Sequence, residues 1–206
     1  PLASDVRDPL AMRVSVVLPD DVRLAEGEDS SGRFALSPDG RRLVVVAVDA
    51  AGESKLWVRP IDGIAAQPLS GTESAGHPFW SPDSGSIAFI ARPRAEGVIG
   101  SQGKLKKIDL AGGQGMTLGD IAFSATGTWN RDGVILFTPT GGSPIHRMPA
   151  SGGPSSRATT LDEASGDAQH VNPFFLPDGR HFLYSVIGSR TNGPTDPRGV
   201  YVGSLD

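Results

Sequence analysis

The amino-acid sequence predicts an all-β fold: a β-propeller of about four four-stranded blades, which is either complete or a fragment of a larger propeller. A strand–turn–strand unit recurs four times, with the mid-forties period typical of propeller blades. The 27 glycines and 17 prolines among 206 residues suit short strands joined by turns better than long helices. A chain of this length suits one domain with a sizeable core, so we treat residues 1–206 as a single propeller domain.

Each repeat is centred on a tight turn that contains an aspartate. The four copies are FALSPDGRRLVVVAV from Phe34, PFWSPDSGSIAFIA from Pro78, GTWNRDGVILFT from Gly127 and PFFLPDGRHFLYSV from Pro173. The turn aspartates Asp39, Asp83, Asp132 and Asp178 follow one another at intervals of 44, 49 and 46 residues. These intervals predict blades over residues 33–70, 77–118, 124–160 and 170–206.

The turn residues have distinct physical roles. In the first copy Pro38 presets φ for the first turn position, Asp39 accepts hydrogen bonds from nearby backbone amides, and Gly40 takes the positive φ that other residues resist. The corresponding structural residues of the later copies are Pro82, Asp83, Asp132, Gly133, Pro177, Asp178 and Gly179. Two copies depart from the pattern, because the third has Asn130-Arg131 in place of Ser-Pro and the second has Ser84 where glycine is usual.

The strands around each turn differ in character. A short apolar strand precedes the turn, and the run that follows it, such as Leu43 to Val48, is apolar enough for a strand buried on both faces. A third strand alternates apolar and polar residues, and a short fourth strand follows in three units. One predicted strand, residues 13–19, belongs to none of these units. We expect it to complete the last blade, because such closure hides two sheet edges.

Composition excludes several classes of function. The net charge is −4 and the charges are interspersed, so we expect no nucleic-acid partner. Cysteine is absent, which removes disulfides, thiolate metal sites and a cysteine nucleophile. The longest apolar run has six residues against the roughly 20 of a membrane helix, so we expect no membrane insertion by this chain. The start PLASDVRDPL resembles no signal peptide and lacks an initiator methionine, so we expect a piece of a longer protein.

The sequence contains near matches to catalytic and nucleotide-binding motifs, but no full match. GVIGSQGKL, from Gly97, has phosphate-loop spacing one residue too long, and Leu105 stands where a serine or threonine must bind magnesium. No serine-hydrolase elbow is present, and one turn aspartate per unit cannot supply the six to eight oxygens of a calcium site. We therefore expect no enzymatic activity in this chain, no metal and no cofactor.

Histidines, tryptophans and two long polar segments are the remaining candidates. His77 and His170 each precede the first strand of a unit, which favours a repeated hydrogen-bonding position over a metal or ligand site. Trp80 and Trp129 precede the turn, where packing between blades is favoured over ligand stacking. Residues 92–102 and 188–198 form long polar connections of the kind that often carry binding on a rigid scaffold. The candidate binding residues are Arg92, Arg94, Glu96, His77, His170, Arg190, Asn192 and Arg198.

The repeats resemble the TolB-type propeller repeat, a WD-like repeat with an SPDG turn. The phrases GKLKKIDLAGG from Gly103, GTWNRDGVILF from Gly127, LPDGRHFLY from Leu176 and GVYVGSLD from Gly199 resemble the non-kinase C-terminal part of large bacterial serine/threonine kinases. That resemblance implies an extracytoplasmic, sensor-like propeller of a membrane-anchored parent. The chain itself contains no HRD, DFG or lysine-bearing kinase strand.

Two other parents fit the same repeats: a prolyl-oligopeptidase-like serine peptidase with a gating propeller, and a free periplasmic TolB-like interaction protein. In all three cases we expect a non-catalytic scaffold whose partner is a protein or a small molecule. If the propeller is open, two apolar blade faces are exposed, and we then expect a homodimer.

Overall fold

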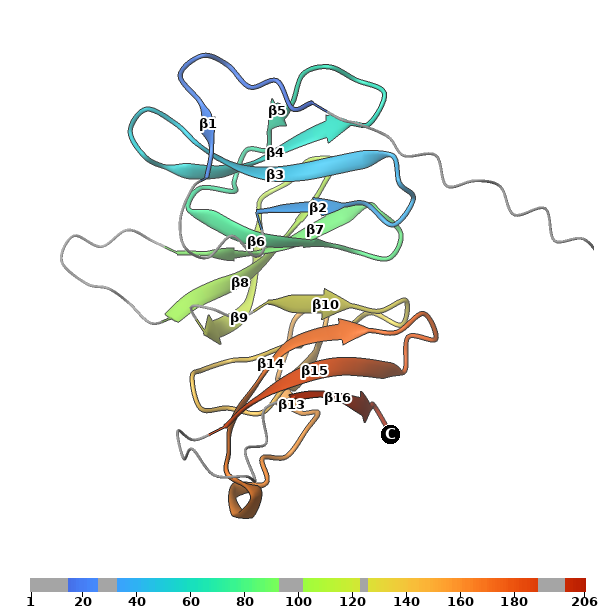
Figure 1. Ribbon diagram of the computed structural model, residues 1–206. Helices are drawn as coiled ribbons and strands as arrows, with labels where there is room; N and C mark the ends of the chain where they lie inside the picture. The colour runs from blue at the N-terminus through green and yellow to red at the C-terminus, as the bar shows by residue number, and fades with distance from the viewer. Residues whose placement is uncertain (1–14, 26–32, 93–101, 123–125, 189–198) are drawn as a thin grey trace, which may run out of the picture.

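The computed structural model describes residues 15–25, 33–92, 102–122, 126–188 and 199–206 (Figure 1). The first sheet contains β1 (Arg23–Leu24), β2 (Phe34–Leu36), β3 (Arg42–Val48), β4 (Ser54–Pro60) and β5 (Gln67–Pro68). The second contains β6 (Ala75–Trp80), β7 (Ser86–Ala91), β8 (Gln102–Asp109) and β9 (Met116–Ala122). The third contains β10 (Gly127–Trp129), β11 (Val134–Phe137), β12 (His146–Pro149) and β13 (Ser156–Arg157). The fourth contains β14 (Asp167–Phe175), β15 (His181–Gly188) and β16 (Gly199–Ser204), and a short 3-10 helix, η1 (Glu163–Ser165), precedes it.

The second, third and fourth sheets are antiparallel meanders in chain order, as in β6-β7-β8-β9. In the first sheet β2, β3, β4 and β5 follow the same order, and β1 pairs with β3 as well. Figure 1 shows the four sheets stacked in sequence order, with the first and the fourth at opposite ends of the stack. The predicted all-β fold, with one sheet for each of the four repeats, is confirmed.

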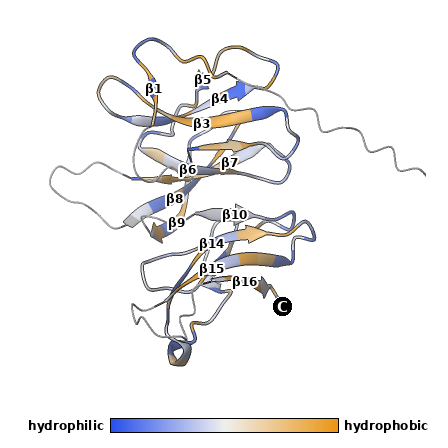
Figure 2. Cartoon of the chain, in the orientation of Figure 1, coloured by the Kyte–Doolittle hydropathy of each residue, from blue (hydrophilic) through white to orange (hydrophobic). Residues whose placement is uncertain are grey.

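The core lies between neighbouring sheets. Side chains alternate along β3, so Val44 and Val46 pack against the second sheet while Val45 and Ala47 face the other way. Trp80 of the second sheet joins the first of these clusters. Figure 2 shows the hydrophobic colour running along the middle of β3. Burial on both faces explains why this strand reads as a continuous apolar run.

The strand connections fall on two opposite sides of the molecule. The aspartate-containing turns join the first strand of each sheet to the second, and they lie on one side (Figure 1). Because the strands are antiparallel, the connections from the second strand to the third lie on the opposite side. We call this opposite side the connection face. Residues 93–101 and 189–198, which contain most of the candidate binding residues, belong to connections that start from this face but lie outside the described residues.

The N-terminal segment covers the first sheet, and the prediction that residues 13–19 complete the last blade is wrong. Val17 forms a parallel bridge with Ala65 of the first sheet, and the Ala66 amide donates to the Val17 carbonyl at 3.4 Å. Val16, Leu18 and Val22 pack against the cluster of Val45, Ala47, Trp57 and Ala66. The physical reason is that the outward side of the first sheet is itself apolar, and the nearest hydrophobic segment shields it. Residues 13 and 14 lie outside the described residues.

The outward side of the fourth sheet is also apolar, but it is exposed. Phe174, Val200 and Val202 are 63%, 70% and 64% exposed. They share one side, because Phe174 and Val202 both pair with Leu183 across the sheet and Val200 lies two residues from Val202. A contiguous apolar surface of this kind typically marks an interaction site.

The second turn contains a serine, Ser84, with a left-handed backbone conformation, and its hydrogen bonds join the first sheet to the second. Ser84 has φ 60°, its hydroxyl accepts a hydrogen bond from the Asp39 amide at 3.1 Å, and its carbonyl accepts one from Arg42 Nη1 at 3.2 Å. A glycine here would avoid the cost of the left-handed conformation, about 1–2 kcal/mol, but would lose the hydroxyl hydrogen bond, about 1 kcal/mol.

We therefore expect opposite outcomes for two substitutions at this serine. Ser84→Ala keeps the strain and loses the hydrogen bond, so it should lower the free energy of unfolding by about 1–2 kcal/mol. Ser84→Gly should leave it within about 1 kcal/mol of the parent, because the two effects offset each other. Urea denaturation of the three proteins measures both values, and equal losses for alanine and glycine would contradict this account.

Candidate functional site

The predicted turn residues form hydrogen-bonded turns. The Ser37 hydroxyl donates to Asp39 Oδ1 at 2.5 Å, and the same carboxylate oxygen accepts the Arg41 amide at 3.0 Å. Asp83 repeats this arrangement, accepting from the Ser81 hydroxyl at 2.5 Å and from the Gly85 amide at 2.9 Å. The turn glycines Gly40, Gly133 and Gly179 have φ of 71°, 74° and 73°. The side chains and backbone of these residues form the turns. We therefore look for a binding site on the opposite side of the molecule.

Asp178 makes the fourth turn sensitive to acid. Its Oδ2 lies 2.6 Å from Nδ1 of His181, and its Oδ1 accepts the amides of Arg180 and His181, both at 2.9 Å. The hydrogen bond from the His181 side chain, followed by those from the two amides, lowers the pKa of Asp178 from 3.8 to about 2.

We expect this carboxylate to contribute stability that disappears in acid. Because its pKa is depressed in the folded protein, the contribution is fully present above pH 3.8 and is lost as the pH falls towards about 2. Asp178→Asn should therefore flatten the dependence of stability on pH in that window. Near neutrality the slope of stability against pH should change little. Urea titrations at several pH values between about 2 and 5 measure the slope. An unchanged slope in the Asp178→Asn protein would show that the turn does not stabilise the ionised form of Asp178 over its protonated form.

The third turn uses a residue whose role the sequence reading missed. Asn130 is buried, and its Oδ1 accepts the amides of Asp132 at 3.1 Å and Val134 at 2.8 Å. Its Nδ2 donates to the Gly179 carbonyl of the fourth sheet at 2.7 Å. Asn130 thus takes the place of the serine of the first two copies and also bonds two sheets together. The usable signal was asparagine, a strong turn-forming residue, at the serine position of the repeat.

The two predicted histidines are not equivalent. His170 is 1% exposed, with Nδ1 2.8 Å from the Thr159 hydroxyl, Nε2 3.0 Å from Asp167 Oδ2, and its ring against Tyr184. Both of its nitrogens therefore serve the fold rather than a ligand. His77 instead lies at an irregularity of β6 with φ 48°, where β14 has Asn172 with φ 55°. The interpretation that the two histidines share one repeated position is therefore wrong, because Asn172 of β14, and not His170, occupies the position equivalent to His77 of β6.

Of the remaining candidate binding residues, the structure describes Arg92. Arg92 follows β7, where its amide donates to the Ser74 carbonyl at 2.9 Å. The other candidates, Arg94, Glu96, Arg190, Asn192 and Arg198, lie outside the described residues.

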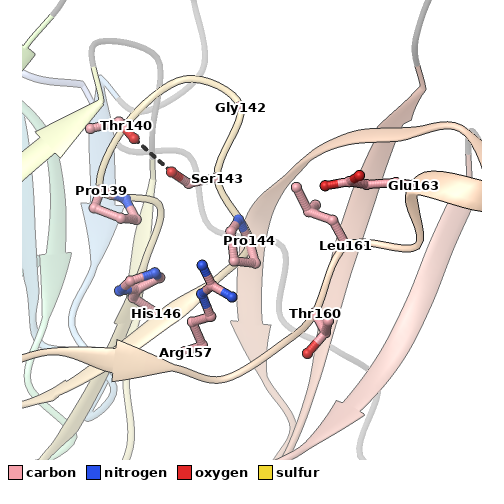
Figure 3. Close-up of a pocket in the computed structure, with 10 residues that line it drawn as sticks. All are labelled: Pro139, Thr140, Gly142, Ser143, Pro144, His146, Arg157, Thr160, Leu161 and Glu163. Atoms are coloured by element: carbon pink, nitrogen blue, oxygen red, sulfur yellow. Dashed lines mark hydrogen bonds between the residues drawn. The ribbon is translucent and has the colours of Figure 1, made fainter.

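A pocket of about 520 Å³ lies on the connection face of the third sheet (Figure 3). One wall is the connection from β11 to β12, and the other is the segment from β13 to η1. The lining residues are Pro139, Thr140, Gly142, Ser143, Pro144, His146, Arg157, Thr160, Leu161 and Glu163. The sequence reading missed this pocket, because its two walls become neighbours only through the pairing of β12 with β13.

Polar groups of the pocket come from rigid elements. His146 and Arg157 are cross-strand partners on β12 and β13, and Figure 3 shows both side chains at the pocket. The His146 ring packs edge-on against Phe137, with 6.3 Å between the ring centroids. Burial, together with the positive charge of Arg157, lowers the pKa of His146. The hydroxyls of Thr140 and Ser143 lie 2.6 Å apart in the facing loop.

In the described parts of the chain, no three His, Cys, Asp or Glu side chains gather closely enough to hold a metal ion. The Ser143 hydroxyl is hydrogen-bonded to Thr140, and no hydrogen bond joins it to His146 among the described residues.

None of the described residues belongs to a helix with the length and apolar character needed to cross a membrane.

Comparison with known proteins identifies the fold. No protein-family model matches the sequence. No curated protein matches it significantly either. Among solved structures, TolB from Acinetobacter baumannii is similar with a TM-score of 0.64 and 15% identity, over 84% of this chain and 40% of that one.

Two further structures extend the comparison. A putative TolB from Agrobacterium tumefaciens is similar with a TM-score of 0.60 and 17% identity, over 88% of this chain and 70% of that one. The β-propeller domain of the Trilobed protease from Pyrococcus furiosus has a TM-score of 0.54 and 14% identity, over 84% of this chain and 55% of that one. The chain thus has a β-propeller fold similar to that of TolB. It spans well under half the length of the Acinetobacter protein.

Proposed function

We propose that this chain is a non-catalytic propeller module that binds a small-molecule or protein ligand at the connection face. The pocket between the β11–β12 connection and η1 carries the proposal, because it places charged and hydroxyl groups on a rigid sheet edge. Propellers use such scaffolds to present binding loops.

The parent we propose is a membrane-anchored bacterial serine/threonine kinase, with this chain as its extracytoplasmic, sensor-like C-terminal region. The support is the resemblance of GKLKKIDLAGG, GTWNRDGVILF, LPDGRHFLY and GVYVGSLD to such proteins. A gating propeller of a serine peptidase and a free TolB-like interaction protein remain the alternatives. The gene sequence on either side of this segment distinguishes them: a kinase domain and one membrane helix upstream, a hydrolase domain downstream, or neither.

An unbiased ligand screen tests the binding function. ¹H–¹⁵N spectra of the 206-residue chain are recorded against a library of small polar compounds. Hits should shift the amides of residues 139–146 and 157–163, and Arg157→Gln should weaken them. Arg41→Gln is the matched control, since Arg41 is an exposed arginine beside the turn at the other end of the strands. The pocket would be excluded as the binding site if neither substitution changes the binding of the hits. It would also be excluded if no compound of the library binds there.

We also propose that the chain forms a homodimer through the outward side of the fourth sheet. This side includes Phe174, Leu183, Ser185, Ile187, Val200 and Val202, none of which is charged, with His181 and Ser204 at its end. Two copies can therefore meet there without like-charge repulsion, whereas the outward side of the first sheet is already covered by residues 16–22.

Sedimentation equilibrium of the chain and of two variants tests the dimer. The parent should show a monomer–dimer equilibrium that Val202→Asp abolishes, because the carboxylate would be buried without a partner. Ile64→Asp, at an apolar residue 77% exposed beside the first sheet, should leave the equilibrium unchanged. A parent that is monomeric at all concentrations would contradict the proposal.

A further inference from the structure

We propose that the pocket of the third sheet binds a small zwitterion, with its carboxylate on Arg157 and its ammonium group on Glu163; this inference rests on the proposed binding function. The two charged side chains line the same pocket, Arg157 from β13 and Glu163 from η1 (Figure 3). Neither forms an ion pair with the other, or with any of the described residues. The pocket therefore offers one positive and one negative group that do not neutralise each other directly.

Arg157 suits the carboxylate end. Its guanidinium presents a planar fork of donors that matches a carboxylate through two parallel hydrogen bonds. His146 lies directly across the strand pair, and burial and the charge of Arg157 lower its pKa, which disfavours a second positive charge beside the guanidinium. The hydroxyls of Thr140 and Ser143, 2.6 Å apart, line the same pocket and offer further hydrogen bonds.

Glu163 suits the ammonium end because the local helix does not use its side chain. Asp162 caps η1 instead, accepting the Ser165 amide at 3.1 Å and the Ser165 hydroxyl at 2.7 Å. The Glu163 carboxylate is thus left to face the pocket, as Figure 3 shows. A carboxylate accepts hydrogen bonds only, and an ammonium group only donates them, so the two match without any change of protonation near pH 7.

Apolar side chains also line the pocket. Pro139 and Pro144 form one side and Leu161 the other, and Pro144 is buried. Such walls favour a ligand with a short apolar backbone between its charged ends over a compact inorganic ion. The opposing walls belong to the third sheet and to its connection to the fourth, so a bound ligand would also bridge the two sheets.

Three peptides that differ only at their ends test the inference by isothermal titration calorimetry. Glycylglycine carries both charges, N-acetylglycylglycine lacks the ammonium group, and glycylglycinamide lacks the carboxylate. Glycylglycine should bind the full chain roughly tenfold or more tightly than either blocked peptide, since each loses one charge-assisted hydrogen-bond set.

Two conservative variants assign each charge to its residue. Arg157→Gln should remove the preference for glycylglycine over glycylglycinamide, and Glu163→Gln should remove its preference over the N-acetylated peptide. Both side chains are exposed, and amide spectra that change only near the pocket would show that the variants fold.

The outcomes separate this inference from the proposed function. No binding of glycylglycine at millimolar concentration, or equal binding of all three peptides, overturns the zwitterion assignment. The proposed binding function fails separately, if the unbiased screen finds no compound that shifts the pocket amides.

Discussion

Replacing Trp80 with alanine should lower the free energy of unfolding by roughly 3–5 kcal/mol, as is typical for a buried tryptophan. Trp80 is 6% exposed and packs between the first and second sheets with Val44 and Ile87. Its indole N–H donates to the Ala35 carbonyl of the first sheet at 3.0 Å. The substitution therefore opens a cavity between two sheets and also removes a hydrogen bond that connects them.

Two further variants separate packing from hydrogen bonding. Trp80→Phe keeps most of the ring volume and loses the N–H, so we expect a loss of about 1–2 kcal/mol. Trp129→Ala is the matched control at the same place of the third sheet. Trp129 is only half-buried, with Lys107 Nζ 5.9 Å from its ring centroid, so its loss should be smaller than that of Trp80→Ala. Urea denaturation followed by far-ultraviolet circular dichroism measures all three, and equal losses at the two tryptophans would contradict this assignment.

Local patterns of the sequence were sufficient for much of the fold. The position of each turn follows from three or four adjacent residues, and a two-residue alternation or a continuous apolar run identifies the strands beside it. The run from Leu43 to Val48 belongs to β3, and the turn that contains Asp39 joins β2 to β3. These are properties of neighbours in the chain, so a single sequence contains them.

What the sequence could not supply depends on contacts between distant residues. Residues 16–22 cover the first sheet rather than completing the last, and sheet-edge arguments alone do not distinguish these two placements. The mismatch of His77 and His170 is a two-residue offset that alignment on Pro78 and Pro173 already contains, and the matching irregularities of β6 and β14 show it in the structure. The pocket was missed for a related reason. Arg157 and the β11–β12 connection become neighbours through the pairing of β12 with β13, which no local sequence motif predicts.

Asn130→Ala is the second substitution expected to have a large effect, about 2–4 kcal/mol, because it leaves several polar groups without partners. The amides of Asp132 and Val134 lose their acceptor, and the Gly179 carbonyl loses its donor from the neighbouring sheet. Gly133 still supplies the positive φ, so the turn can form, but of its hydrogen bonds to the fourth turn it keeps the one from Arg131 Nη2 to the Pro177 carbonyl and loses the one from Asn130.

The control lies at the equivalent position of the first copy. Ser37 accepts the Arg42 amide at 2.9 Å and donates to Asp39, and both of these bonds stay within one turn. Ser37→Ala should therefore cost less than Asn130→Ala, by about the 1–2 kcal/mol of the hydrogen bond between sheets. Hydrogen exchange adds a second readout: the amides of Asp132 and Val134 should exchange faster in Asn130→Ala. Equal losses in the two variants, with unchanged exchange, would mean that the hydrogen bond from Asn130 to the Gly179 carbonyl does not stabilise the contact between the third and fourth sheets, and that the asparagine serves only its own turn.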